Sequence, residues 1–211
     1  MAHDTRRGVM VVISSPSGAG KTTLANLVLQ SDKHIHPSIS YTTREKRPGE
    51  VHGTHYYFTD RATFKQMEQD SKFLESAEVF DHLYGTPKDV VESYLQNGDD
   101  IIFDIDWQGH RSLKALAPED VVSIFLLPPS KKELKERLSK RAQDTHETIM
   151  LRMQKANSEL QHWKEYDYVI VNKDLKESLN KLLSILRAER LRKNRRVGLF
   201  EFVQQMIDET A

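Results

Sequence analysis

The feature that most constrains this chain is a glycine-rich loop between a short apolar run and a helical segment. Val9 to Ile13 is a β-branched run without polar alternation, which is typical of a strand covered on both faces of its sheet. Lys21 to Gln30 has the pattern of a helix, and the loop before it reads Ser15-Pro-Ser-Gly-Ala-Gly-Lys21-Thr22. In such a setting, backbone N–H groups and a helix N-terminus surround phosphate oxygens. The pattern therefore predicts a P-loop that binds a nucleoside triphosphate; the alternative is a turn that only caps a helix.

Individual positions of this loop have expected roles. Gly18 and Gly20 allow the backbone to approach a phosphate closely. Lys21 is expected to reach the β- and γ-phosphates, and the Thr22 hydroxyl to ligate Mg²⁺. Ser15 departs from the usual pattern, which starts with glycine, so we expect an altered turn with the phosphate cradle retained. The expected ATP-binding residues of the loop are Ser15, Pro16, Ser17, Gly18, Ala19, Gly20, Lys21, Thr22 and Thr23.

Three further apolar runs, Ile101 to Asp106, Val121 to Leu127 and Tyr168 to Asn172, predict more buried strands. Helical segments separate them, including one that starts after Thr86-Pro87 and stops before Gly98. Alternating strands and helices of these lengths predict an α/β fold of the P-loop type, with three layers and a parallel central sheet. Ligands of such a sheet bind beyond the carboxyl ends of its strands.

Two segments interrupt this alternation. Residues 38–90 are rich in Tyr, Thr, His and Gly and have shorter elements, so we expect an inserted subdomain there. Residues 129–160 are charged and helical, with capping boxes at Ser130-x-x-Glu133 and Asp144-x-x-Glu147, and predict a movable lid. The core then consists of residues 1–37, 91–128 and 161–211.

Composition excludes several classes of protein. Lys plus Arg and Asp plus Glu number 31 each, so no overall field favours nucleic acid or an anionic membrane as a partner. The absence of Cys excludes disulfides and thiolate chemistry, and the apolar runs are too short to span a bilayer. We expect a cytoplasmic protein without a membrane or nucleic-acid partner. A nucleic-acid role for the basic run from Arg187 to Arg196 is an alternative to a solvated helix end.

The segment Ser40-Tyr-Thr-Thr-Arg44-Glu-Lys-Arg47-Pro-Gly-Glu-Val-His-Gly53, followed by Tyr56, carries a family resemblance. It resembles the signature of the guanylate kinases. The resemblance extends along the chain to about residue 190 and includes Phe73-Leu-Glu75, Tyr84-Gly-Thr86, Asp104-Ile-Asp106-x-Gln-Gly109 and Val169-Ile-Val-Asn172.

The resemblance implies that residues 38–90 bind GMP. Arg44 and Arg47 would contact its phosphate through planar guanidinium groups, with Tyr56 and Tyr84 adding hydroxyl donors. Guanine presents N1–H and N2–H donors and an O6 acceptor, which suits a carboxylate together with hydroxyl groups. These roles fall to Glu75, Ser40 and Thr86, the last where the family commonly has Ser. The two tyrosines also fit as packing aromatics.

The resemblance also assigns residues at the strand ends. Asp104 would lie on the Mg²⁺ side of the site, and Asp106 near the GMP base or ribose, although Asp106 alone also fits as the N-cap of a helix. Asn172 would lie near the adenine or ribose of ATP, although alone it fits equally well as the N-cap of the last long helix.

Three arginines match the lid arginines of the family: Arg137, Arg141 and Arg152. Arg137 and Arg141 lie four apart and therefore on one helix face, and a simple ion pair between Arg137 and Glu133 is the alternative explanation. Together with Lys21 and Arg44, the lid arginines are the expected catalytic residues, because phosphoryl transfer needs charge stabilisation on the moving group.

The implied activity is transfer of the γ-phosphoryl group of ATP to GMP or dGMP, giving ADP and GDP, with ATP and Mg²⁺ as donor and cofactor. ATP and GMP are the expected small-molecule partners, and a homo-oligomer is possible. Two alternatives stay open: a non-catalytic guanylate-kinase-like binding module, and a kinase of a different small phosphate acceptor such as a ribose phosphate.

Overall fold

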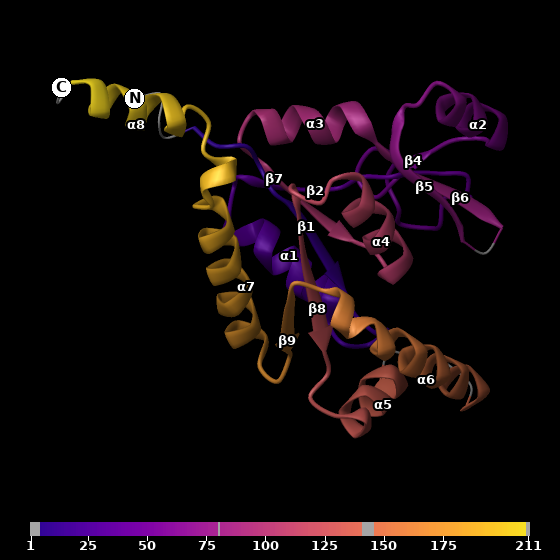
Figure 1. Cartoon of the computed structure of the whole chain (residues 1–211). Coiled ribbons are helices and arrows are strands. Elements are labelled where there is room, and N and C mark those ends of the chain that lie inside the picture. Colours follow the sequence, from indigo (N-terminus) through magenta and orange to yellow (C-terminus); the bar gives the residue numbers. More distant parts are fainter. Residues whose placement is uncertain (1–4, 80, 141–145, 210–211) are drawn as a thin grey trace.

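Figure 1 shows the computed structural model of the chain, which describes residues 5–79, 81–140 and 146–209. Its centre is a five-stranded sheet in the order β2-β7-β1-β8-β9, and every neighbouring pair is parallel. The predicted α/β fold with a parallel central sheet is confirmed. The strands are β1 (Met10–Ser14), β2 (Ile35–Pro37), β7 (Asp100–Asp104), β8 (Val121–Leu127) and β9 (Tyr168–Val171).

Alternate residues of β1 enter two different cores, which produces the three layers. Val11 and Ile13 pack in the cluster formed with α1 (Lys21–Ser31) and α7 (Leu175–Arg190). Met10 and Val12 pack in the cluster formed with α3 (Lys88–Gln96) and α4 (Trp107–Leu116). All five residues of β1 are buried, which explains its apolar run without polar alternation.

A second, four-stranded sheet lies within residues 38–90, in the order β4-β3-β6-β5. Its elements are β3 (Tyr41–Thr42), β4 (Tyr57–Phe58), α2 (Arg61–Gln69), β5 (Phe73–Val79) and β6 (His82–Pro87). The ring of Phe64 on α2 packs 4.5 Å from that of Phe73, measured between centroids, and both approach the backbone of Gly85. A Cβ at Gly85 would lie 2.9 Å from carbons of both rings, so only glycine fits at this point of the sheet.

Residues 129–160 contain α5 (Lys131–Lys140) and α6 (His146–Leu160), followed by the 3₁₀ helix η2 (Gln161–Glu165). Leu134 and Leu138 of α5 pack against Ala156 of α6, so the two helices share a small core of their own. The Ser130 hydroxyl accepts a hydrogen bond from the Glu133 N–H at 3.1 Å, which confirms the predicted start of α5. Asp144, which begins the second predicted capping box, lies outside the described residues.

The last long helix, α7, begins at Leu175, and its N-cap is Asp174, whose carboxylate accepts the Glu177 N–H at 2.8 Å. The alternative in which Asn172 caps this helix is therefore wrong, because the chain needs two more residues to turn from β9 into α7. The 3₁₀ helix η3 (Lys193–Arg195) and the terminal helix α8 (Leu199–Asp208) complete the chain, and Figure 1 shows α8 projecting beyond α7.

The basic run at the end of α7 is partly turned into the protein. Arg190 donates to Asp32 and to the buried Asp100, both at 2.7 Å, and the side chain of Arg195 is 2% exposed. Two of its cations are thus engaged with the core and do not form a solvated surface. Among the described residues, no helix is long and apolar enough to cross a membrane.

Candidate active site

The glycine-rich loop leaves the carboxyl end of β1 and leads directly into α1. Gly18 and Gly20 have positive φ values of 89° and 101°, which favour glycine. Gly20 is the N-cap of α1 and carries no side chain that could bind the first-turn N–H groups. These donors therefore face the loop, the arrangement that binds phosphate.

Lys21 and Thr22 converge on Asp104, the last residue of β7. The Lys21 ammonium forms an ion pair with the Asp104 carboxylate and donates to the Ile105 carbonyl at 3.3 Å. The Thr22 hydroxyl donates to Asp104 Oδ2 at 3.0 Å. This pairing arises because β1 and β7 are neighbouring parallel strands, so their carboxyl ends meet at one edge. A hydroxyl oxygen beside a carboxylate is a donor set that suits Mg²⁺.

Lys21, Thr22 and Asp104 line a common cavity of about 250 Å³. Its lining residues are Ser15, Pro16, Ser17, Gly18, Gly20, Lys21, Thr22, Asp104, Asp106 and Glu159. Asp106 is the N-cap of α4, because its Oδ1 accepts the N–H groups of Gln108 and Gly109, each at 3.0 Å. The capping alternative for Asp106 is thus confirmed, and the same carboxylate lines the cavity.

Asn172 supports the loop from the other side. Its Nδ2 donates to the Ala19 carbonyl at 2.9 Å, and its Oδ1 accepts from the Ser178 hydroxyl at 3.0 Å. A Cβ at Gly20 would lie 2.7 Å from the same Nδ2. Asn172 therefore holds the position of the loop, which is a role that the sequence did not reveal.

In the second sheet, Glu75 and Thr86 lie opposite each other on β5 and β6, and the Thr86 hydroxyl donates to Glu75 Oε1 at 2.7 Å. Burial raises the pKa of Glu75, the Thr86 hydrogen bond lowers it, and the charge of Asp106 raises it further. The pair consists of a half-buried carboxylate and a buried hydroxyl, and a ligand with matching donors and acceptors would be recognised strongly there.

Arg44 lies in an aromatic corner. Its guanidinium is 5.4 Å from the centroid of the Tyr56 ring, and the Tyr56 and Tyr84 rings meet edge to face at 5.9 Å. Arg44 Nη2 donates to Glu50 Oε1 at 2.6 Å, and this hydrogen bond raises the pKa of Arg44. The other oxygen of Glu50 accepts the Arg47 backbone N–H at 2.8 Å. Arg47 itself is exposed and Ser40 is half-buried.

Comparison with known proteins decides the family. The guanylate kinase family profile matches residues 7–189. The chain is 50% identical to guanylate kinase of Rhizobium etli over 97% of its length and 93% of that protein, and 52% identical to guanylate kinase of Rhodopseudomonas palustris over 95% and 92%. The crystal structure of guanylate kinase from Anaplasma phagocytophilum is 39% identical, covers 95% of each chain and superposes with a TM-score of 0.77.

This chain belongs to the guanylate kinase family.

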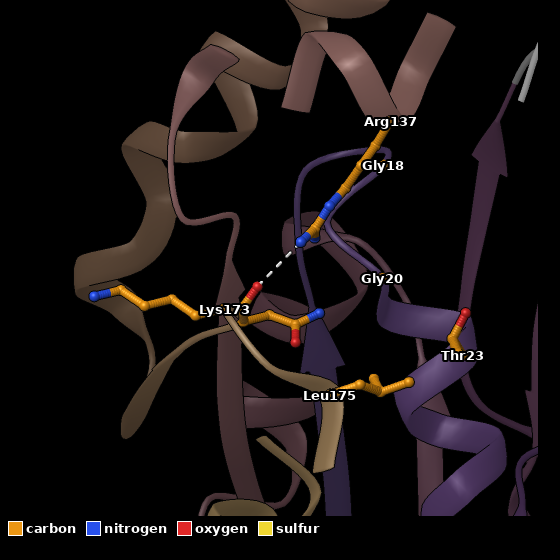
Figure 2. Close-up of a pocket in the computed structure, with 7 residues that line it drawn as sticks. Gly18, Gly20, Thr23, Arg137, Lys173 and Leu175 are labelled. Carbon is orange, nitrogen blue, oxygen red and sulfur yellow. Dashed lines mark hydrogen bonds between the residues drawn. The ribbon is translucent and has the colours of Figure 1, made fainter. Parts of the chain in front are cut away.

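Within this guanylate-kinase fold, one predicted lid arginine already reaches the P-loop. Arg137 on α5 donates to the carbonyls of Asn172 and Ala19 at 3.3 Å and 3.4 Å, and it pairs with Glu133 at 3.2 Å. Figure 2 shows its side chain extending from the helix toward the loop, with the bond to the Asn172 carbonyl. The expected pair with Glu133 exists, but it is only one of three contacts.

Arg137 and the loop line a second cavity of about 400 Å³, together with Gly18, Gly20, Thr23, Asn172, Lys173 and Leu175. Arg152 lies half-buried on α6, and Arg141 lies outside the described residues. The structure thus gathers the P-loop, Asn172 and Arg137 around one site. Tyr84, Glu75 and Thr86 lie on strands of the second sheet, and Arg44 and Tyr56 lie in segments next to its strands.

Two carboxylates of this site were not predicted. Glu50 stands inside the signature segment, but a carboxylate in a polar loop gives no sign that it will pair with an arginine six residues earlier. Glu159 lies near the end of the charged helix α6, far along the chain from the P-loop, and its Oε2 accepts the Ser17 N–H at 3.1 Å.

Proposed function

We propose that this guanylate-kinase family member transfers the γ-phosphoryl group of ATP to GMP or dGMP, giving ADP and GDP. The observation that carries the proposal is a P-loop in which Lys21 and Thr22 both contact the Asp104 carboxylate. Beside it, a separate sheet holds the half-buried Glu75 carboxylate, which is hydrogen-bonded to the buried Thr86 hydroxyl. The first group of residues suits a triphosphate and the second suits guanine.

On the ATP side, the N–H groups of the loop from Ser15 to Thr23 hold the phosphates and Lys21 balances their charge. Thr22 and Asp104 are the residues that would hold Mg²⁺, which when bound offsets negative charge on the phosphates. The cavity beside Asn172, Thr23 and Arg137 is where we place the nucleoside.

On the GMP side, Glu75 accepts guanine N1–H and N2–H, while Thr86 and Ser40 face O6. Adenine would present a bare N1 acceptor to the Glu75 carboxylate, and two buried acceptors without a hydrogen between them disfavour binding. Arg44 and Arg47, with the hydroxyls of Tyr56 and Tyr84, bind the GMP phosphate. Glu50 orients Arg44 toward that position before GMP arrives.

During transfer, positive charge must surround the moving phosphoryl group, and we assign this to Lys21, Arg44, Arg137, Arg141 and Arg152. Arg137 now donates to two backbone carbonyls, and these neutral acceptors are weaker partners than phosphate oxygens. We propose that the lid, residues 129–160, and the GMP-binding subdomain, residues 38–90, close over the core formed by residues 1–37, 91–128 and 161–211. Closure excludes water and limits wasteful ATP hydrolysis.

A coupled assay of ADP release tests the proposal, with ATP, Mg²⁺ and one acceptor at a time: GMP, dGMP, AMP, UMP, CMP or ribose phosphates. We expect turnover with the guanine nucleotides alone and its loss in Lys21→Ala. Tight GMP binding without ADP formation would instead indicate a binding module, and turnover of another acceptor would refute the guanine pocket. We also propose that the protein works in the cytoplasm without a nucleic-acid or membrane partner.

A further inference from the structure

Glu159 places a negative charge in the cavity that we assign to the phosphates. It lies near the end of α6, is half-buried, and its carboxylate accepts the Ser17 N–H at 3.1 Å. The same cavity contains Lys21 and Thr22. Glu159 has no role in the phosphoryl transfer proposed above.

A carboxylate at this place opposes the binding of another anion. It takes a P-loop N–H that a phosphate oxygen would otherwise accept, and it adds its charge to those of Asp104 and Asp106 in the same cavity. Burial raises the pKa of Glu159, whereas the Ser17 N–H and the Lys21 charge lower it. The carboxylate thus occupies the loop in the way that a small anion would.

The end of α6 is held firmly, so this contact is not that of a loose surface side chain. His162 of η2 stacks on Trp107 of α4, with ring centroids 4.0 Å apart and planes inclined by 9°. Arg111 of α4 donates twice to Glu165, each time at 2.7 Å, and His162 Nδ1 lies 2.7 Å from the same carboxylate. Glu159 lies one helical turn before His162, so these contacts set its position over the loop.

We propose that Glu159 is an internal competitor for the P-loop: its carboxylate occupies the Ser17 N–H until the triphosphate of ATP displaces it. The inference rests on the proposed function, because it requires the triphosphate to bind in this cavity. Glu159 acts on the binding of ATP and does not touch the reacting atoms, so it is not a catalytic residue. Its charge and its hydrogen bond to the loop lower the affinity for ATP.

The test is calorimetric titration of the full chain with the β,γ-imido analogue of ATP and Mg²⁺, and separately with inorganic tripolyphosphate. Glu159→Gln keeps the size and one acceptor oxygen but removes the charge, and Glu159→Ala removes both. We expect both variants to bind each probe more tightly, with a dissociation constant about fivefold lower. In the coupled assay, KM for ATP should fall without a rise in kcat.

Glu136→Gln is the matched control, because it removes one negative charge from an exposed position of α5 in the same lid. Its dissociation constants should change less than about twofold, since exposed charges are screened by salt. A gain in affinity cannot come from damage to the fold, which makes the direction of the effect decisive.

Unchanged or weaker binding in Glu159→Gln and Glu159→Ala overturns the proposal; weaker binding would mean that the carboxylate braces the loop. Lys21→Ala separates this result from failure of the proposed function. If Lys21→Ala binds the ATP analogue as tightly as the parent chain, the P-loop is not the nucleotide site and both conclusions fail. If Lys21→Ala binds the ATP analogue weakly and the parent chain phosphorylates GMP, the proposed function stands and only the role of Glu159 is at issue.

Discussion

Replacement of Glu75 by glutamine tests the guanine pocket most directly. The carboxylate is half-buried, accepts the Thr86 hydroxyl at 2.7 Å, and is expected to accept two guanine N–H groups. Glutamine has nearly the same shape but turns one acceptor into a donor, which would face a guanine donor. One charge-assisted hydrogen bond is lost and one buried donor is left unpaired, each at about 1.5 to 2 kcal/mol, so kcat/KM for GMP should fall by about two to three orders of magnitude.

The coupled ADP-release assay measures this loss with GMP and AMP side by side. Adenine offers an amino donor next to the N1 acceptor, which matches the glutamine amide. The ratio of kcat/KM for GMP to that for AMP should therefore fall by a larger factor than kcat/KM for GMP itself. Glu78→Gln, on the same strand but exposed and paired with Arg61, should retain full activity.

Folding provides the second control. Burial raises the pKa of Glu75, so ionisation of this carboxyl above its unfolded pKa destabilises the folded chain. The free energy of unfolding of Glu75→Gln at neutral pH should therefore be no lower than that of the parent chain. A folded Glu75→Gln variant that keeps kcat/KM for GMP within about threefold of the parent would refute the proposed contact with guanine.

Three further outcomes are expected. Lys21→Ala should lower kcat by about three orders of magnitude while the chain stays folded, as measured by turnover and thermal denaturation. Gly85→Ala should lower the free energy of unfolding by about 1 to 3 kcal/mol in urea, because the new methyl overlaps two phenylalanine rings; no change would contradict the close approach. The hydrogen bonds from Arg111 hold the pKa of Glu165 at about 2, below its unfolded value. The Arg111–Glu165 pair therefore stabilises the fold fully above about pH 4.5, and this stabilisation is lost as pH falls toward 2. The free energy of unfolding, measured between pH 4.5 and pH 2, should therefore change less with pH in Glu165→Gln than in the parent chain. Identical curves for the two proteins would argue against the Arg111–Glu165 pair.

The sequence by itself determined the local parts of this protein. Buried strands appear as apolar runs, so the run at Val121 to Leu127 coincides with β8. N-caps depend on residues three apart, so Ser130 was identifiable as one, and Asp106 as a candidate for another. The glycine-rich loop could be recognised because its backbone conformation requires glycine at Gly20. Strand β2 was not predicted, because a segment of three residues that ends in proline is too short to show a strand pattern.

Only the tertiary structure decided which distant groups meet. Asn172 appeared able to cap a helix, yet it supports the P-loop through the Ala19 carbonyl, 153 residues earlier in the chain. Glu159 contacts Ser17 across 142 residues, and the apparently free cation Arg195 is buried. Local propensities depend on a few neighbouring residues and are visible along the chain. Such contacts depend on how helices pack over the sheet, and no short stretch of sequence contains that information.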